Sequence, residues 1–456
     1  MALSAAPRMA VLNGTAVAVV VGYCLAMAWA LASTPFDIWG AFLIGPALIL
    51  VSLPILLREG RLDPDPRMGT LLIIGLVLKL FAALPRYWMS FELYDGAADA
   101  ARYAIEGGIV AEQVRNGDLA PNTGLPLVGT GFVVLVTGYV FALTGPTTLG
   151  GFIFFSWLGF WGLFFFNRAF REGVPGGDRW RFAVLLFLLP SMLFWPSSLG
   201  KDALMLFGLG IFAYGAALVL NYRAIGWLYL LAGSAITVLV RPHITLMAVF
   251  GLCLAYVLRK HPKERSTFRT MAFAAVLIVG ASFALQRAAG FFGLESLEAE
   301  DISSVIERTG ERTTGGGSTF EAAPASSPLN LPSSIITVLY RPFPFEAHNV
   351  QTLITSLEGT VLLILTIMSF SRLRRLPRYL RSTPYLVFVI VYALMFCYAF
   401  SSFSNFGILA RERIMVFPMI IALLALSARA DLGRQPDAVS RPPGRTDALA
   451  GRGHRL

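Results

Sequence analysis

Long apolar segments recur along most of the chain and are separated by short polar or basic stretches. A membrane-crossing helix needs roughly 20 mainly apolar residues. The segments of that character are residues 11–33, 38–57, 70–84, 152–166, 182–196, 203–220, 225–240, 244–258, 271–285, 351–370, 384–400 and 414–428. This pattern predicts an all-α, polytopic integral membrane protein with about 12 transmembrane helices.

Composition points the same way, since 56% of the 456 residues are hydrophobic and only 14% are charged. The mean hydropathy of +0.67 excludes an ordinary soluble domain. Cys24, Cys253 and Cys397 all lie within apolar segments, so neither a disulfide framework nor a thiolate metal site is expected. The net charge of +10 comes largely from basic loops, so the expected partner is the lipid bilayer and not nucleic acid.

Basic residues set the expected orientation, because loops rich in Lys and Arg stay on the cytoplasmic side of a membrane. Such residues gather in the loops at 58–67, 168–181, 259–269 and 372–381. The first apolar segment lacks a small-residue cleavage site, so we expect it to be retained. We therefore predict a multi-pass protein of the cell inner or plasma membrane, with both termini cytoplasmic, a membrane domain at 1–428 and a disordered tail at 429–456.

One further apolar segment, 126–143, is ambiguous between a crossing and a shorter element. Arg168 and Arg171 belong on the cytoplasmic side, which requires an odd number of crossings between Asp95 and Arg168. If 152–166 is the crossing, residues 126–143 form a re-entrant or juxtamembrane element.

Two longer polar segments are expected on the external side. Within 86–125, helical spacing at 94–114 predicts an amphipathic helix on the membrane surface. The loop at 287–350 begins with acidic residues and continues with many Gly, Ser and Pro residues. It is either a mobile segment that closes over a substrate or a plain solvated connector.

The stretch 331–359 places Arg341, Glu346 and His348 directly before an apolar segment. Pro342 and Pro344 follow Arg341, so a helix is expected to end there and to give way to extended backbone. The stretch is therefore either an interfacial connector anchored by its phenylalanines or one wall of an active site.

Charged residues and histidines at the external ends of the predicted helices form the candidate site. They are Asp95, Asp99, Lys201, Asp202, Arg241, His243, Arg341, Glu346, His348, Arg411 and Arg413. Taken singly, they have simpler roles as ion pairs, turn residues or interface anchors. Because charges near the lipid are costly, several on one face indicate a shared polar cavity.

Carboxylates beside arginines suit the transfer of a sugar from a lipid phosphate. An ionised carboxylate accepts the proton of an acceptor hydroxyl, and guanidinium groups match phosphate oxygens. The catalytic candidates are Asp95, Asp99, Glu346 and His348, and the substrate-binding candidates are Lys201, Asp202, Arg241, His243, Arg341, Arg411 and Arg413. No metal-ligand set is predicted, and the cofactor is left open, with a divalent metal as one option.

An external amphipathic helix containing Asp95 and Asp99, an apolar body of many spans and a long late external loop together resemble the glycosyltransferase-C superfold. The resemblance implies a membrane glycosyltransferase that moves a sugar from a polyprenyl-phosphate donor to a glycan or lipid acceptor of the cell envelope. It implies that the reaction takes place on the non-cytoplasmic face, with Asp95 or Asp99 as the base. The chain differs from simple members because its loop follows the third span.

Three other interpretations remain open. His348 and Asn349, followed after nine residues by Gly359, are similar to the His-Asn…Gly pattern of O-antigen ligases and polymerases. A flippase or transporter of a lipid-linked glycan would show internal repeats and charges within spans; Lys79 is the one such charge that the segments contain, and no repeat is evident. A non-catalytic assembly partner is a third possibility.

Overall fold

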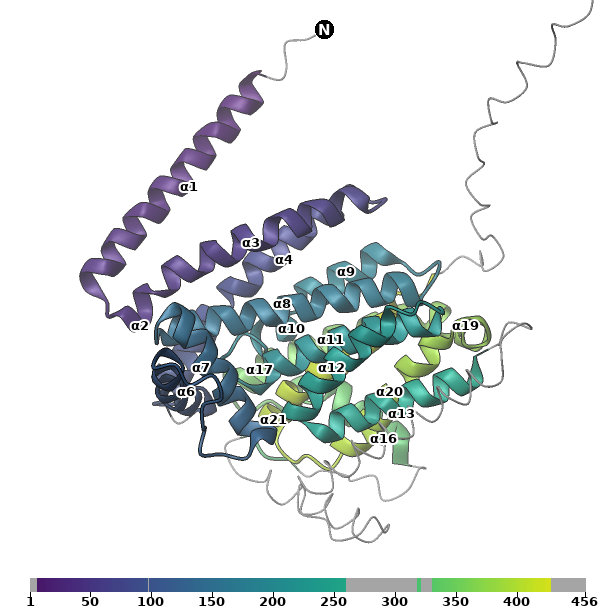
Figure 1. Cartoon of the computed structure of the whole chain (residues 1–456). Helices are drawn as coiled ribbons and strands as arrows, with labels where there is room; N and C mark the ends of the chain where they lie inside the picture. The colour runs from purple at the N-terminus through teal and green to yellow at the C-terminus, as the bar shows by residue number, and fades with distance from the viewer. Residues whose placement is uncertain (1–5, 97, 260–317, 321–329, 428–456) are drawn as a thin grey trace, which may run out of the picture.

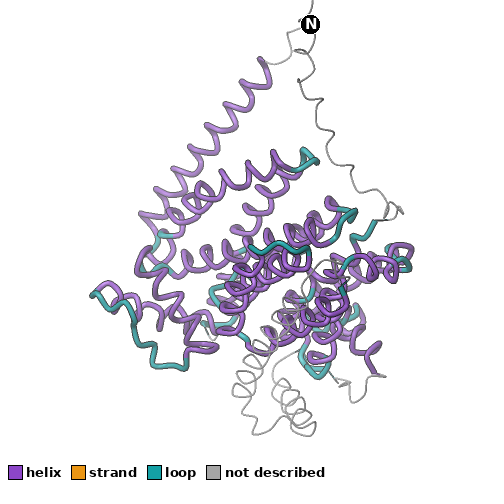
Figure 2. The backbone as a smooth tube through the Cα atoms, turned by 45° about the vertical axis from the view of Figure 1, so that its right-hand side comes forward, coloured by secondary structure: helices purple, strands orange, loops and turns teal. Residues whose placement is uncertain are grey.

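The computed structural model describes residues 6–96, 98–259, 318–320 and 330–427. In these ranges the backbone is helical or in loops, and the only strand-like pairing is an isolated bridge between Thr319 and Asn405. Figure 2 shows the same arrangement, with helices joined by short connections. The all-α prediction is confirmed for the part of the chain described.

The helices are numbered along the chain as in Figure 1. The first half contains α1 (Ala6–Ser33), α2 (Phe36–Trp39), α3 (Ala41–Leu62), α4 (Met68–Phe81), α5 (Ala83–Trp88), η1 (Met89–Leu93), α6 (Asp99–Arg115), η2 (Leu127–Gly131), α7 (Phe132–Thr144), α8 (Thr148–Gly173), α9 (Arg179–Leu188), α10 (Pro190–Phe194) and α11 (Lys201–Leu220). The second half contains α12 (Gly226–Val240), α13 (Pro242–Leu258), α16 (Leu331–Tyr340), η4 (Pro344–Glu346), α17 (Val350–Met368), α18 (Phe370–Leu373), α19 (Leu376–Ser382), α20 (Pro384–Phe400), α21 (Phe406–Glu412), η5 (Arg413–Met415) and α22 (Phe417–Leu424).

Six of the described helical stretches are long and apolar enough to cross a bilayer. They are Phe36–Leu62, Met68–Leu93, Leu127–Thr144, Thr148–Gly173, Lys201–Leu220 and Val350–Met368. Shorter apolar helices include α12, α13, α16 and α20. The protein is therefore a membrane protein by its helices, and the expected total of about 12 crossings stays a prediction.

The core is centred on α8 and α11, which lie against each other along most of their length. Glycines allow this close approach: a Cβ on Gly210 would lie 2.2 Å from the carbonyl oxygen of Gly162. On the opposite side, a Cβ on Gly233 of α12 would lie 2.5 Å from the backbone nitrogen of Phe212 in α11. Small residues that let helix backbones touch are the usual basis of packing in membranes. In contrast, α1 projects away from the other helices in Figure 1.

Two predicted continuous helices are broken in the structure. Segment 182–196 divides at Leu189 into α9 and α10, because Pro190 lacks an N–H and forces the residue before it into extended backbone. Segment 414–428 is replaced by η5 and the short α22, with Pro418 at the start of α22. The break predicted between 225–240 and 244–258 is confirmed, since Arg241 separates α12 from α13.

The helix expected at 94–114 is present but starts later than its spacing predicts. Asp95 has φ of 45° and Gly96 has φ of 71°, so both lie in a left-handed turn between η1 and α6. The helix begins at Asp99. The prediction of a helix starting at residue 94 is wrong, and Asp95 does not share a helical face with Asp99.

The ambiguous segment 126–143 packs on α6. A Cβ on Gly107 of α6 would lie 2.5 Å from the methyl carbon of Thr137 in α7, and the guanidinium of Arg115 donates to the carbonyls of Phe141 (2.7 Å) and Ala142 (3.1 Å). The helix α7 is preceded by non-helical backbone at 128–129. Since 127–144 is also long and apolar enough to cross, the re-entrant interpretation stays a prediction.

Three expected features fall outside the described residues. They are the span at 271–285, most of the external loop at 287–350 and the tail at 429–456.

Candidate functional site

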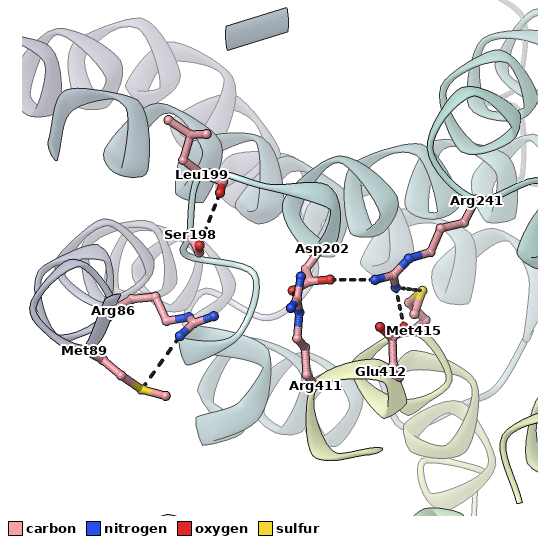
Figure 3. Close-up of polar contacts among 9 residues, drawn as sticks. All are labelled: Arg86, Met89, Ser198, Leu199, Asp202, Arg241, Arg411, Glu412 and Met415. Carbon is pink, nitrogen blue, oxygen red and sulfur yellow. Dashed lines mark hydrogen bonds and ion pairs between the residues drawn. The ribbon is translucent and has the colours of Figure 1, made fainter. Parts of the chain in front are cut away.

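A network of buried charges joins three parts of the chain that are distant in sequence. Asp202, in the first turn of α11, accepts from Nε of Arg411 in α21 and lies 3.3 Å from Nη2 of Arg241, at the α12–α13 break. The other side of Arg241 pairs with Glu412. Figure 3 shows these four side chains close together, with Arg411 below Asp202 and Glu412 below Arg241. Asp202 is only 3% exposed, so its charge is neutralised by the two arginines and not by water.

Next to this network is a cavity of about 680 Å³. Arg86, Tyr94, Asp99, Asn349, Gln351 and Arg411 supply polar groups to its wall. These residues come from α5, the η1–α6 turn, the start of α17 and α21. Arg411 is therefore shared, since it contacts Asp202 on one side and the cavity on the other.

Short side-chain contacts fix the polar rim of the cavity. The hydroxyl of Tyr94 donates to Oε1 of Gln351 at 3.1 Å. Asn349 caps α17, because its Oδ1 accepts from the N–H of Thr352 at 2.8 Å. Asn405 does the same for α21, accepting from the N–H of Gly407 at 2.9 Å.

Arg86 lies in the cavity wall on an aromatic support. Its guanidinium carbon is 5.3 Å from the ring centroid of Phe194 and 5.0 Å from that of Trp195. Its Nη1 contacts the sulfur of Met89 at 3.7 Å. In Figure 3 the guanidinium points from α5 towards the Arg411 and Asp202 pair. Cation–π stacking of this kind fixes the position of a guanidinium without neutralising it.

Two buried charges hold the short helix α10, which ends beside this aromatic support. The carboxylate of Glu358 in α17 accepts from the N–H of Ser191 at 3.1 Å and from its hydroxyl. At the other end, the ammonium of Lys79 donates to the carbonyls of Met192 (3.0 Å) and Leu193 (2.9 Å). A carboxylate at the start and an ammonium at the end complement the helix dipole.

The segment around Arg341 forms a separate, local arrangement. As predicted, α16 ends at Tyr340, before the prolines. Nε and Nη2 of Arg341 donate to Oε1 of Glu346 at 2.9 and 2.6 Å, and the N–H of Phe343 donates to the same carboxylate. Partial burial opposes ionisation of Glu346, but the hydrogen bond from Arg341 holds its pKa below the usual value. Arg341 also stacks over Phe320, at 4.6 Å.

The structure brings together part of the candidate set. Asp99 and Arg411 line the cavity, Asp202 and Arg241 lie behind Arg411, and Lys201 precedes Asp202 at the start of α11. The others are outside the wall that the described residues form: Asp95, His243, Arg341, Glu346, His348 and Arg413.

Arg413 and His348 show why position in sequence does not decide position in the site. Arg413 is fully buried and donates to the carbonyl of Arg341 at 2.9 Å, two residues from Arg411, which reaches the cavity. His348 is exposed, and its backbone N–H donates to the hydroxyl of Thr352 at 3.1 Å. The neighbour of His348, Asn349, is the residue that lines the cavity.

Sequence reasoning missed Arg86, Trp195 and Gln351, and it noted Glu412 between Arg411 and Arg413 without assigning it a role. The signal for Arg86 was its place directly after the apolar segment 70–84, where a charge at a helix end either anchors in the headgroups or enters a polar cavity. The sequence around the other residues does not mark them as part of a site, because the same residue types occur in ordinary loops and at ordinary helix ends.

Within the described ranges, no group of three or more His, Cys, Asp or Glu residues is placed to hold a metal ion. Comparison with family models, curated proteins and solved structures finds no match to this chain. The site must therefore be interpreted from its own geometry.

Proposed function

We propose that the protein is a membrane glycosyltransferase that moves a sugar from a polyprenyl-phosphate carrier to a glycan or lipid acceptor of the cell envelope. In this proposal both termini are cytoplasmic and the reaction takes place on the non-cytoplasmic face of the cell membrane. The observation that carries it is one cavity that combines the guanidiniums of Arg86 and Arg411 with the exposed carboxylate of Asp99.

The transfer requires a base and a cationic site, and the cavity wall offers both. The acceptor hydroxyl oxygen forms a bond to the anomeric carbon of the sugar, and the bond from that carbon to the phosphate oxygen breaks. The hydroxyl proton passes to the carboxylate of Asp99. The bonding electrons leave with the phosphate, whose charge is stabilised by the guanidiniums of Arg86 and Arg411.

A lipid-linked donor also needs a path for its chain beside the cavity. The helix α17 starts at the cavity rim and exposes a stripe of large apolar side chains along its length. These are Val350, Ile354, Leu357, Val361 and Ile364, which recur at helical spacing on one face. This face would lie in the hydrocarbon while the phosphate sits among the polar residues of the rim.

The test compares Asp95 and Asp99, since the sequence alone does not show which of the two is the base. The purified protein is reconstituted in liposomes with a polyprenyl-phosphate sugar, and product formation is measured. Asp99→Asn should lower the rate by about 10²-fold or more, because it removes the base. Asp95→Asn serves as the matched control and should keep most of the activity. If Asp99→Asn retains the wild-type rate, Asp99 is not the base.

One observation favours a carrier of lipid-linked glycans as a second candidate. The helix α10 is short and broken, and it is held at its ends by Glu358 and Lys79 within the helical body. Discontinuous helices with buried charges are typical of transporters. Labelled lipid that crosses the bilayer without any change in its glycan would support the carrier over the transferase.

A ligase or polymerase of lipid-linked oligosaccharides is favoured by the position of Asn349 in the cavity wall, next to His348. The reconstituted protein is offered a polyprenyl-diphosphate oligosaccharide. Transfer of the whole glycan, abolished by His348→Ala, would identify a ligase. Single-sugar addition from a monophosphate carrier that tolerates His348→Ala supports the transferase.

A further inference from the structure

Arg86 is a buried cation whose charge is left unpaired among the described residues. Its side chain contacts the sulfur of Met89 and two aromatic faces, and it makes no ion pair within the ranges that the structure describes. The residue is only 7% exposed, and its Nε has no hydrogen-bond acceptor there. A buried charge without a partner is strongly unfavourable. Arg413 is also buried without an ion pair among the described residues, but Arg86 lines the cavity, where a ligand of opposite charge can reach it.

The carboxylate of the buried network that faces Arg86 in Figure 3, that of Asp202, is already paired with other arginines. Asp202 is held by Arg411 on one oxygen and by Arg241 on the other. The four-residue network is neutral by itself, since it contains two arginines and two carboxylates. Arg86 therefore adds a positive charge that the network does not cancel.

The start of α6 faces the same cavity with both backbone N–H groups and the carboxylate of Asp99. Ala98 and Asp99, at the start of α6, line its wall, and Ala98 provides no side-chain cap for the helix. The first-turn N–H groups of a helix attract anions. Arg86 and Arg411 are thus the two cationic side chains of the described cavity wall, and Asp99 is its carboxylate.

We propose that Arg86 and Arg411 form the binding site for the phosphate group of the lipid substrate, with Arg86 as the cation reserved for it. The anionic character of the ligand follows from the geometry, whereas its polyprenyl chain rests on the proposed function. Arg86 fixes the phosphate against the Trp195 side of the cavity. Arg411 contacts it while remaining paired with Asp202.

The experiment is a lipid titration of the purified full-length protein in detergent, followed by native mass spectrometry. Polyprenyl phosphate should bind as one copy, and polyprenol, its uncharged match, should not. Phosphatidic acid tests whether an ordinary phospholipid is the source of the phosphate and should bind at least tenfold more weakly. Arg86→Gln should weaken the binding of polyprenyl phosphate by about 10- to 100-fold, as expected for loss of a hydrogen bond between charged groups.

Arg102→Gln is the matched control, because Arg102 lies nearby on α6, is exposed and is already paired with Glu106 at 2.8 Å. It should bind polyprenyl phosphate as the wild type does. Arg86→Lys keeps the charge but loses the planar fork, so its affinity should fall between those of the wild type and Arg86→Gln. Where Arg86→Gln does not fold, Arg86→Met keeps the test decisive, because it removes the charge and places an apolar side chain against Phe194 and Trp195. Wild-type affinity in Arg86→Met would then overturn the site.

Wild-type affinity in a folded Arg86→Gln, or equal binding of polyprenol and polyprenyl phosphate, would overturn the phosphate site. Equal or tighter binding of phosphatidic acid would overturn the polyprenyl carrier as its ligand. Sugar transfer is measured separately on the same variants. Binding that depends on Arg86, without sugar transfer by the wild type, would support the phosphate site and refute the transferase. Sugar transfer that is unchanged in Arg86→Gln would refute the phosphate site and support the transferase.

Discussion

The Asp202 network and the Arg341–Glu346 pair are built from the same kinds of side chain but are held in different ways. Arg341 and Glu346 are five residues apart and face each other across one proline-rich turn. Asp202 meets arginines that are 39 and 209 residues away in the chain. Asp202 is buried, whereas about a fifth of the Arg341 and Glu346 side chains is exposed.

This difference separates a structural turn from a site. The local pair is complete in itself, because each charge is satisfied by the other and by the turn. The network ends at a cavity, where Arg411 lines the wall and the unpaired Arg86 leaves positive charge available. Under the proposed function, the charges assembled from distant helices border the substrate cavity, and the local pair does not.

The largest expected effect comes from breaking the network at its centre. Asp202→Asn leaves Arg411 and Arg241 buried beside a neutral group, and we expect a loss of about 3–5 kcal/mol in the free energy of unfolding. Chemical denaturation in mixed micelles measures this loss. A change below about 1 kcal/mol would mean that water or lipid headgroups neutralise these arginines.

A smaller effect is expected at the end of the network. Glu412→Gln removes one partner of Arg241, but Arg241 keeps Asp202 at 3.3 Å. The expected loss is about 1–3 kcal/mol, measured by the same denaturation. A loss larger than that of Asp202→Asn would place the centre of the network at Arg241 and not at Asp202.

The local pair should matter less still. Glu346→Gln should lower the free energy of unfolding by about 1 kcal/mol or less, since partly exposed ion pairs contribute little. Because the pKa of Glu346 is lowered in the folded protein, its contribution is present at neutral pH and is lost as the pH falls through that lowered value. The difference between wild type and Glu346→Gln should therefore be constant from about pH 7 to 5 and disappear only in stronger acid.

Added salt should change the stability contributions of the Asp202 network and of the Arg341–Glu346 pair differently, and this is the smallest effect that we expect. At 1 M salt the screening length falls to about 3 Å, so the contribution of the partly exposed Arg341–Glu346 pair should decrease. The effect of Asp202→Asn should persist, because the buried network excludes ions. Denaturation of both variants at low and high salt provides the comparison, and equal salt dependence would contradict the difference in burial.

Particular elements show how far the sequence predicts this structure. The apolar runs give α3, α4, α8, α11, α17 and α20 because a bilayer requires them, and the prolines after Arg341 and Arg241 end helices where expected. Prediction was wrong at 182–196, where Pro190 breaks an apolar run, and at Asp95, where a left-handed turn precedes the helix. Both errors arise because apolar or helical spacing continues across a local backbone break.

The sequence by itself determined the membrane character, the all-helical class and the presence of charges at helix ends, since these follow from composition and periodicity. Only the tertiary structure decided which charges meet. It joined Asp202 to Arg411 and Arg241, satisfied Arg341 locally and left Arg86 facing the cavity. The physical reason is that pairing depends on distances between helices, set by contacts such as Gly162 with Gly210, which no local pattern encodes.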